Sequence, residues 1–436
     1  MTQRFDVDEF RRLAQADREL RYAARGLSTL VRLGIGEQMF DITFDDGVVS
    51  EVATAGDGEP GVILSAPEEW WQEVFTPGLP KVEYAGFTAA SMHGLNAEGD
   101  FLAIRAPYNL ALQRLYQVVR ASVVGWPERR PSSNPFKATD TAVGRYIYIA
   151  ANGVESRIYY ETAGTGDTPL LLQATAGTDS RQYRYLLADP AMQERFTMYA
   201  YDLPFHGKSL PPEGVRWWEE PYLPTREYLM NWVVGIADEL GLDQPFFMGT
   251  SVGGQLALDL AAEYGDRFGG FIAVNGWYDM PPVKLDNNLF RTPAVSPELF
   301  PALCFGSTAP NAPEDTAHEV YFVYRSNYAG VYAGDNDYFM TGHDLKENGH
   351  KIDALTKPVF VVTGEYDHAS QDEKHGGPAV ERNIPGARFI LAEGIGHFAP
   401  SDDPVAFGEF IVPVLDEALA YAAAGKERAS SAEVAR

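Results

Sequence analysis

The stretch FFMGTSVGG, residues 246–254, decides the fold of this chain. Its first three residues form an apolar run that predicts a buried strand, and the glycines that follow predict a sharp turn around Ser251. From Gln255 to Tyr264 apolar side chains recur at helical spacing, which predicts a helix. The sequence thus places Ser251 on a tight turn between a buried strand and a helix.

This turn carries the pattern Gly-x-Ser-x-Gly, which in a strand–turn–helix setting is typical of a nucleophile elbow. A serine on such a turn is held in strained backbone geometry, and side chains at Gly249 and Gly253 would collide with their surroundings. The serine hydroxyl would project above the sheet edge, over the first free N–H groups of the helix. The alternative interpretation is an ordinary helix start, with Thr250 or Ser251 as the N-cap.

Composition and charge narrow the classes of function. The length of 436 residues predicts two or three domains. The 35 basic and 61 acidic side chains give a net charge of −26, so we expect neither nucleic acid nor a membrane surface as a partner. Cys304 is the single cysteine, and no Cys/His cluster has metal-ligand spacing, so we expect no disulfide, metal or cofactor. No apolar leader and no run of roughly 18 apolar residues is present, which predicts a cytoplasmic protein.

The first 130 residues predict a small α+β domain. Apolar spacing predicts a helix from Asp8 to Arg25, and alternation on either side of the turn at 45–47 predicts a hairpin over 38–52. Further strands are predicted at 62–64 and 100–104, and further helices at 67–75 and 107–124.

This order of elements resembles the sterol-carrier-protein type 2 family over residues 5–124. The matching stretches are FDITFDDGVVSEV (40–52), VILSAPEEWWQEVF (62–75) and LNAEGDFLAIRAPYNLALQRL (95–115). The resemblance implies an apolar cavity or groove, which Trp70, Trp71 and Phe75 either line or seal as part of the core. We expect residues 1–130 to serve homodimer assembly, ahead of ligand capture or plain stabilisation of the next domain.

A stretch rich in proline and polar residues, 126–135, indicates a linker before a second domain over residues 131–436. In that domain strands alternate with helices, which predicts an α/β architecture with a mostly parallel sheet and helices on both faces. Strands are predicted at 146–149, 156–160, 170–172, 196–201, 246–248, 271–274, 358–363 and 388–391, and helices at 181–187, 225–240, 255–264 and 404–422. From about 278 to 356 an aromatic insertion interrupts this pattern, and we expect a lid there, or else a small subdomain.

The second domain resembles the α/β-hydrolase superfamily over about residues 144–422. The resemblance is carried by PLLLQATAGTDSRQY (169–183), AYDLPFHGKS (200–209), FMGTSVGGQLALDLAAEY (247–264), PVFVVTGEYDH (358–368) and FILAEGIGHFAPSDDP (389–404). The family's nucleophile position falls on Ser251, its acid on Asp367 and its histidine on His397. Their order along the chain is also the order of that family.

The chemistry of acyl transfer gives each of these residues a role. His397 would take the serine proton as general base, and Asp367 would fix the histidine tautomer and stabilise the imidazolium. Asp279 and Glu365 are rival acids, since each also lies near the end of a predicted strand. The remaining histidines are not needed for this triad: His206 matches a structural histidine of the family, and His343, His350, His368 and His375 are expected at the surface or in the lid.

The tetrahedral oxyanion of such a reaction requires N–H donors aimed at it. The resemblance implies the N–H of Val252, directly after the nucleophile, and the N–H of Thr175. Where the family has His-Gly-x after this strand, the chain has Gln173-Ala174-Thr175, so a side-chain role for Gln173 or Thr175 stays open.

A complete triad predicts attack on a carbonyl group. We expect a serine hydrolase, an esterase or lactonase, that cleaves an uncharged, largely apolar ester or lactone through an acyl-enzyme, because the insertion is aromatic and basic residues are not clustered. Carbon–carbon bond hydrolases and cofactor-free oxygenases use the same triad scaffold, and a ligand-binding receptor is a further alternative. Turnover of a chromogenic short-chain ester would separate an enzyme from a receptor.

Overall fold

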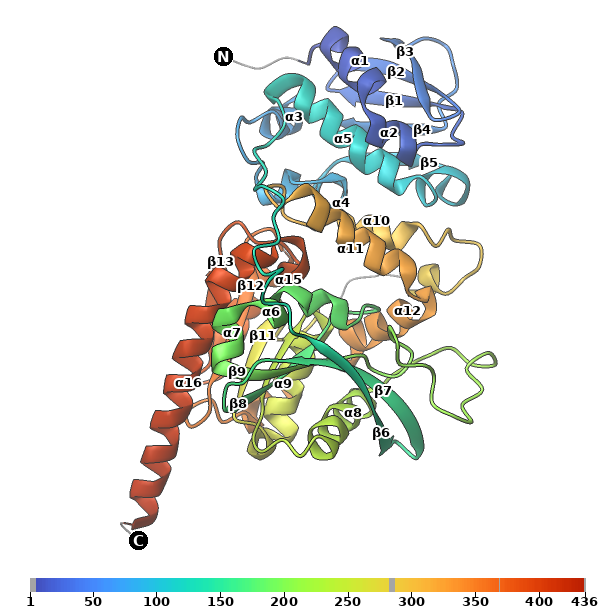
Figure 1. Ribbon diagram of the computed structural model, residues 1–436. Helices are drawn as coiled ribbons and strands as arrows, with labels where there is room; N and C mark the ends of the chain where they lie inside the picture. Colours follow the sequence, from blue (N-terminus) through green and yellow to red (C-terminus); the bar gives the residue numbers. More distant parts are fainter. Residues whose placement is uncertain (1–4, 282–286, 368, 435–436) are drawn as a thin grey trace. The chain divides into compact units, whose positions relative to one another are not determined.

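A computed structural model describes residues 5–281, 287–367 and 369–434 of the chain. The chain divides into two compact units, whose elements are labelled in Figure 1. The first unit comprises residues 1–131 and 292–325, and the second comprises residues 132–291 and 326–436. His368 and residues 282–286 of the predicted lid lie outside the described residues.

The first unit is built on a five-stranded sheet in the order β3-β2-β1-β4-β5. Strand β1 pairs antiparallel with β2 and parallel with β4, and both outer pairs are antiparallel. The strands are β1 (Thr29–Ile35), β2 (Gln38–Asp45), β3 (Val48–Thr54), β4 (Val62–Ala66) and β5 (Asn96–Gly99). The helices are α1 (Val7–Ala16), α2 (Arg18–Ala23), α3 (Glu68–Val74), α4 (Phe87–Met92), α5 (Asn109–Val124) and α10 (Leu299–Phe305), with α11 (Glu314–Ser326) up to Arg325.

The predicted hairpin and the helices predicted at 67–75 and 107–124 are present, but two local predictions in this unit are wrong. The helix predicted from Asp8 to Arg25 is two helices, because Asp17 is extended and its carboxylate caps α2 by accepting from the Leu20 N–H. The strand predicted at 100–104 is a π-helical turn, which Asp100 begins by accepting from the Ala103 N–H. In both places an aspartate ends one element and caps the next.

The aromatic residues of α3 and the adjacent Phe75 seal the core of the first unit. Trp71 is 1% exposed, and its indole N–H donates to the Gly34 carbonyl oxygen at 2.9 Å. Phe75 stacks on Trp71 with 5.6 Å between ring centroids, and the Trp70 indole N–H donates to the His93 carbonyl oxygen. Of the two roles that the sequence left open for these aromatic residues, packing in the core is the one their contacts describe.

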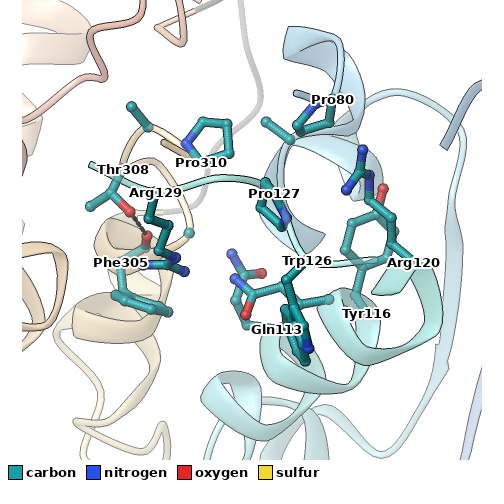
Figure 2. A pocket seen from close by; sticks show the side chains of 14 residues that line it. Pro80, Gln113, Tyr116, Arg120, Trp126, Pro127, Arg129, Phe305, Thr308 and Pro310 are labelled. Atoms are coloured by element: carbon teal, nitrogen blue, oxygen red, sulfur yellow. Dashed lines mark hydrogen bonds between the residues drawn. The ribbon is translucent and has the colours of Figure 1, made fainter. Parts of the chain in front are cut away.

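Figure 2 shows a pocket of the first unit at the C-terminal half of α5. Its lining includes Gln113, Tyr116, Arg120, Trp126, Arg129 and Phe305, and none of the α3 aromatic residues. Its volume is about 40 Å³, enough for water molecules but far below the roughly 300 Å³ at which sites for small organic ligands begin. This pocket is therefore not the apolar cavity that the sterol-carrier resemblance implied.

The second unit is built on an eight-stranded sheet in the order β13-β12-β11-β10-β8-β9-β7-β6. Six strands from β13 to β9 run parallel, and β7 and β6 complete the sheet by antiparallel pairing. The strands are β6 (Val143–Ala151), β7 (Val154–Ala163), β8 (Thr168–Gln173), β9 (Phe196–Tyr201), β10 (Phe246–Thr250), β11 (Gly270–Val274), β12 (Val359–Gly364) and β13 (Arg388–Ala392). The helices are α6 (Arg184–Ala188), α7 (Pro190–Arg195), α8 (Arg226–Glu239), α9 (Val252–Glu263), α12 (Ala329–Asp337), α13 (Leu345–Asn348), α14 (Gly377–Asn383), α15 (Ala399–Asp402) and α16 (Pro404–Val434).

Alternating side chains of the central strands divide the core of this unit into two layers. Phe247 of β10 packs in one layer with Trp232 of α8 and Leu256 of α9. Its neighbour Met248 packs in the other layer with residues of α6, α7 and α16, among them Phe407. Helices therefore cover both faces of the sheet, as the alternation of strands and helices predicted (Figure 1).

The turn between β10 and α9 leaves no room for side chains at its glycines. A Cβ atom on Gly249 would lie 2.2 Å from the Gly253 carbonyl oxygen, and one on Gly253 would lie 2.6 Å from the Gln173 carbonyl oxygen. A Cβ on Gly254 would lie 2.5 Å from the Val274 carbonyl oxygen. Side chains at Gly249 and Gly253 would therefore collide with their surroundings, as the sequence predicted. The close approaches also show that the turn packs directly against β8 and β11.

The insertion between β11 and β12 is divided between the two units. Residues 292–325 belong to the first unit, where α10 packs against α5. Residues 326–358 belong to the second unit and include α12 and α13. The lid predicted at 278–356 is therefore not a single element of the second domain, because the apolar side of α10 is buried within the first unit.

This division predicts how a truncated chain behaves. Residues 132–436 alone should expose Leu299, Phe300 and Phe305 of α10, bind a hydrophobic dye and aggregate. The same fragment with residues 292–325 replaced by a flexible Gly-Ser linker should stay dispersed. Light scattering and dye fluorescence measure the difference, and equal behaviour of the two fragments would contradict the division.

The turn after β10 predicts a second, local effect on stability. Gly249→Ala should lower the free energy of unfolding by roughly 1–3 kcal/mol, because overpacking forces the backbone apart. Gly265→Ala is the matched control, since nothing lies within 4 Å of a Cβ at that position. Chemical denaturation compares the variants, and equal stabilities would mean that the turn can relax.

Candidate active site

Ser251 lies at the apex of the turn between β10 and α9. Its backbone has φ 58° and ψ −112°, a conformation that residues other than glycine rarely adopt and that costs on the order of 1–3 kcal/mol. The Ser251 N–H donates to the Val274 carbonyl oxygen at 2.8 Å, which helps to hold this geometry. Ser251 occupies the N-cap position of α9, but its side chain makes no capping bond to the helix.

Asp367 and His397 lie on the loops that follow β12 and β13, two adjacent parallel strands. Nδ1 of His397 is 2.8 Å from Oδ2 of Asp367. Burial lowers the pKa of His397, but the charge and hydrogen bond of Asp367 outweigh it and raise this pKa above its ordinary value. Among the described residues no hydrogen bond joins Ser251 to His397, so that contact stays a prediction.

Two residues that the sequence analysis missed support the Asp367–His397 pair. The Ser370 hydroxyl donates to the same Oδ2 of Asp367 at 2.5 Å. The Asn275 side chain donates to the His397 carbonyl oxygen at 2.7 Å and accepts from the Gly364 N–H at 2.9 Å. Asn275 thus joins the histidine loop to the end of β12. Its position directly after β11 was the only sequence signal for this role.

The two rival acids lie elsewhere. Asp279 is buried, and Oδ2 of its carboxylate binds Nδ1 of His375 at 3.0 Å and the Lys346 ammonium group. Glu365 accepts from the Gly394 N–H at 2.7 Å and so fixes the turn before His397. Of the three candidate acids, Asp367 is the one bonded to His397.

The loop after β8 holds the second expected oxyanion donor. The Thr175 N–H donates to Oε1 of Gln182 at 2.9 Å, so in this structure a side chain of the protein occupies the donor. The amide group of Gln173 donates to the Ala174 carbonyl oxygen, within the same loop. Val252, the other expected donor, is the first residue of α9 and directly follows Ser251.

Two buried histidine–aspartate pairs join the insertion to the sheet and its helices. Nε2 of His206 is 2.7 Å from Oδ2 of Asp335 on α12, and Nδ1 of His343 is 3.1 Å from Oδ1 of Asp259 on α9. In each case burial lowers the histidine pKa, and the aspartate outweighs burial and raises it. His206 is buried, and each of its ring nitrogens has a hydrogen-bond partner. His343 is buried, not at the surface, because it reaches the middle of α9.

Within residues 5–281, 287–367 and 369–434, no three His, Cys, Asp or Glu side chains come together as metal ligands. In the same ranges no helix has both the length and the hydropathy that crossing a bilayer requires.

Comparisons with known proteins cover part of the chain. A family model described as alpha/beta hydrolase fold matches residues 168–327. The chain is 21% identical over 297 residues to the 2-hydroxy-6-oxononadienedioate/2-hydroxy-6-oxononatrienedioate hydrolase of Paraburkholderia phymatum, covering 64% of this chain and 98% of that protein. It is 21% identical over 298 residues to the proline iminopeptidase of Thermoplasma volcanium, covering 62% of this chain and 96% of that protein.

Solved structures with a similar fold include two hydrolases. An esterase from Thermogutta terrifontis has a TM-score of 0.52 and 19% identity, and covers 64% of this chain and 99% of its own. The enol-lactonase from Burkholderia xenovorans has a TM-score of 0.52 and 22% identity, and covers 62% of this chain and 100% of its own. The sterol-carrier resemblance of the first domain finds no support in these matches. The family model, the sheet order and these structures together indicate that the chain contains an α/β-hydrolase fold.

Proposed function

We propose that the protein is a serine hydrolase that cleaves a carboxylic ester or lactone of a largely apolar small molecule through an acyl-enzyme. The observation that carries the proposal is the hydrogen-bonded Asp367–His397 pair on the loops that follow β12 and β13 in a sheet whose central strand leads into the strained Ser251 elbow. Nucleophile, base and orienting acid are the three groups that acyl transfer by serine requires.

In this mechanism His397 accepts the proton of the Ser251 hydroxyl as the oxygen attacks the substrate carbonyl carbon. Nδ1 of His397 donates to Asp367, which leaves Nε2 free of a proton and fixes it as the base. The carboxylate then stabilises the imidazolium that forms. His397 returns the proton to the leaving alkoxide, and water attacks the acyl-enzyme by the same steps in reverse order.

The oxyanion of the tetrahedral intermediate is stabilised by the N–H groups of Val252 and Thr175. Because the Thr175 N–H donates to Gln182 in this structure, an incoming oxyanion replaces the Gln182 side-chain oxygen on that donor. The exchange of one acceptor for another keeps the N–H bonded in both states. It favours the charged intermediate over a neutral carbonyl, since charged acceptors form the stronger bond.

The uncharged, apolar character of the substrate rests on composition. The insertion is rich in aromatic side chains, and the chain has no cluster of basic residues in its sequence that would select an anionic substrate. Two similar structures are named as an esterase and an enol-lactonase, and this supports attack on the carbonyl carbon of an ester or lactone.

A second candidate is hydrolysis of a carbon–carbon bond. The observation that favours it is the similarity, over nearly the full length of each relative, to proteins named as 2-hydroxy-6-oxononadienedioate hydrolases. The same serine and histidine would act in that reaction. It differs from ester hydrolysis in its leaving group, which is a carbon atom instead of an alkoxide oxygen. A substrate panel therefore separates the two candidates.

Ser251→Ala tests the nucleophile. A fluorophosphonate should label the wild-type protein at Ser251, and the variant should lose labelling together with on the order of 10³-fold or more of kcat on 4-nitrophenyl butyrate. Ser401→Ala, close to His397 in the chain, is the control and should keep both. Labelling at another residue, with turnover surviving in Ser251→Ala, would refute the assignment. Faster turnover of a 2-hydroxy-6-oxo dienoate than of any ester would favour the second candidate.

Asp367→Asn and Asp279→Asn test the acid and its effect on pH dependence. Asp367→Asn should lower kcat by about 10²- to 10⁴-fold, because the wrong histidine tautomer is then favoured, and Asp279→Asn should change it little. His397 must be neutral to act as a base, so kcat/KM should rise with pH through a pKa above that of an ordinary histidine. In Asp367→Asn this rise should move to lower pH. The reverse ranking of the two variants, or an unmoved pH profile, would rule out Asp367 as the partner of the base.

A further inference from the structure

The segment 173–178, which comprises the last residue of β8 and the loop that follows it, is enclosed on two sides. On one side it lies against the first turn of α9, where a Cβ on Gly253 would be 2.6 Å from the Gln173 carbonyl oxygen. On the other side it lies against α12, where a Cβ on Gly177 would be 2.6 Å from the Cβ of Tyr332. The loop that carries the Thr175 N–H therefore has little freedom to move unless α12 moves with it.

Asp335 of α12 binds this loop directly. Oδ2 of Asp335 accepts from the Gly177 N–H at 2.7 Å, and the same oxygen is 2.7 Å from Nε2 of His206. Asp335 is 1% exposed and His206 is 3% exposed, so water does not compete for these bonds. A carboxylate buried to this degree is costly unless it is paired, and here its charge binds both the loop and the histidine.

The second nitrogen of His206 shows how this contact is fixed. Nδ1 of His206 is 2.9 Å from the Pro204 carbonyl oxygen, which can only accept a hydrogen bond. Nδ1 therefore carries a proton, and the ring is anchored to the backbone that follows β9. Gly334, next to Asp335, packs so closely that its Cβ would lie 2.3 Å from the Tyr222 carbonyl oxygen. Helix α12 thus packs closely against the backbone at Tyr222 as well as against the loop after β8.

We propose that Asp335, together with His206, is a positioning residue that sets the place of the oxyanion loop, so that the insertion contributes to transition-state stabilisation without contacting the substrate. This inference rests on the proposed function, because it needs an oxyanion for the Thr175 N–H to bind. Its physical content is that the Asp335–Gly177 bond determines where the Thr175 N–H lies relative to Ser251. A displacement of about 1 Å in such a donor is enough to cost on the order of 100-fold in rate.

The chain provides a matched control. Asp259 is also fully buried and also pairs with a histidine across the border of the insertion. Here the aspartate lies on α9, outside the insertion, and the histidine, His343, lies within it. It accepts from the Tyr338 hydroxyl at 2.7 Å as well. None of the hydrogen bonds of Asp259 goes to residues 173–178. Its loss should therefore weaken the fold without displacing the oxyanion loop.

The experiment compares alanine and asparagine variants at Asp335 and Asp259 in the full-length protein. Asp335→Ala should lower kcat on 4-nitrophenyl butyrate by about 10- to 100-fold with KM nearly unchanged, and it should weaken binding of a phenylboronic acid by a similar factor. The boronate forms a tetrahedral adduct and so reports on the oxyanion donors. Asp335→Asn keeps an oxygen that can accept from Gly177 and should lose less. Both Asp259 variants should melt at lower temperature than the wild type but keep boronate affinity.

Each outcome decides the matter. If Asp335→Ala does not fold, Asp335→Asn is compared with Asp259→Asn instead. A loss of boronate affinity in Asp335→Asn but not in Asp259→Asn supports the proposal. Unchanged kcat and boronate affinity at Asp335, or an equal loss at Asp259, overturns it. Ser251→Ala is measured in parallel. If that variant stays active, the proposed function fails, whereas an inactive Ser251→Ala with a fully active Asp335→Ala refutes the positioning role alone.

Discussion

The structure of the second unit depends on one backbone constraint, the turn that holds Ser251 at a φ of 58°. Such a residue is strained, and it persists only where its surroundings leave it no alternative. Here the surroundings are the carbonyl oxygens of β8, β11 and α9, which approach Gly253, Gly254 and Gly249 so closely that no side chain fits. The central position of β10 therefore has two consequences. It buries the strand in the core, and it forces the backbone of Ser251 out of the commonly populated φ/ψ regions.

The loops that carry the other proposed catalytic groups follow strands of one direction. Strands β8, β10, β12 and β13 are parallel, so their carboxyl ends share one edge of the sheet. Each delivers one loop to that edge, and residues far apart in the chain meet there. Asn275 adds a direct link, since its side chain bonds the His397 loop and the end of β12 at once. The position of His397 is thus held at its backbone carbonyl by Asn275 and at its ring by Asp367.

The insertion after β11 is held in two different ways. Its part in the first unit is buried by apolar side chains of α10, such as Phe300 and Phe305. Its part in the second unit is held by buried polar pairs, of which Asp335 with His206 is the one that reaches the loop after β8. A buried ion pair offsets its desolvation cost only when its geometry is good. The contacts of Asp335 therefore constrain how this part of the insertion meets the loop after β8.

The sequence by itself determined the local elements and the candidates for the triad. Strand–turn–helix patterning located Ser251, because that signal depends on neighbours in the chain, and the resemblance to the α/β-hydrolase superfamily implied Asp367 and His397. Only the tertiary structure decided which acid binds His397, that Asn275 supports it, and that residues 292–325 leave the second unit for the first. These outcomes depend on contacts between residues dozens or hundreds of positions apart. A period of two or 3.6 residues carries no information about which buried partner a polar side chain finds.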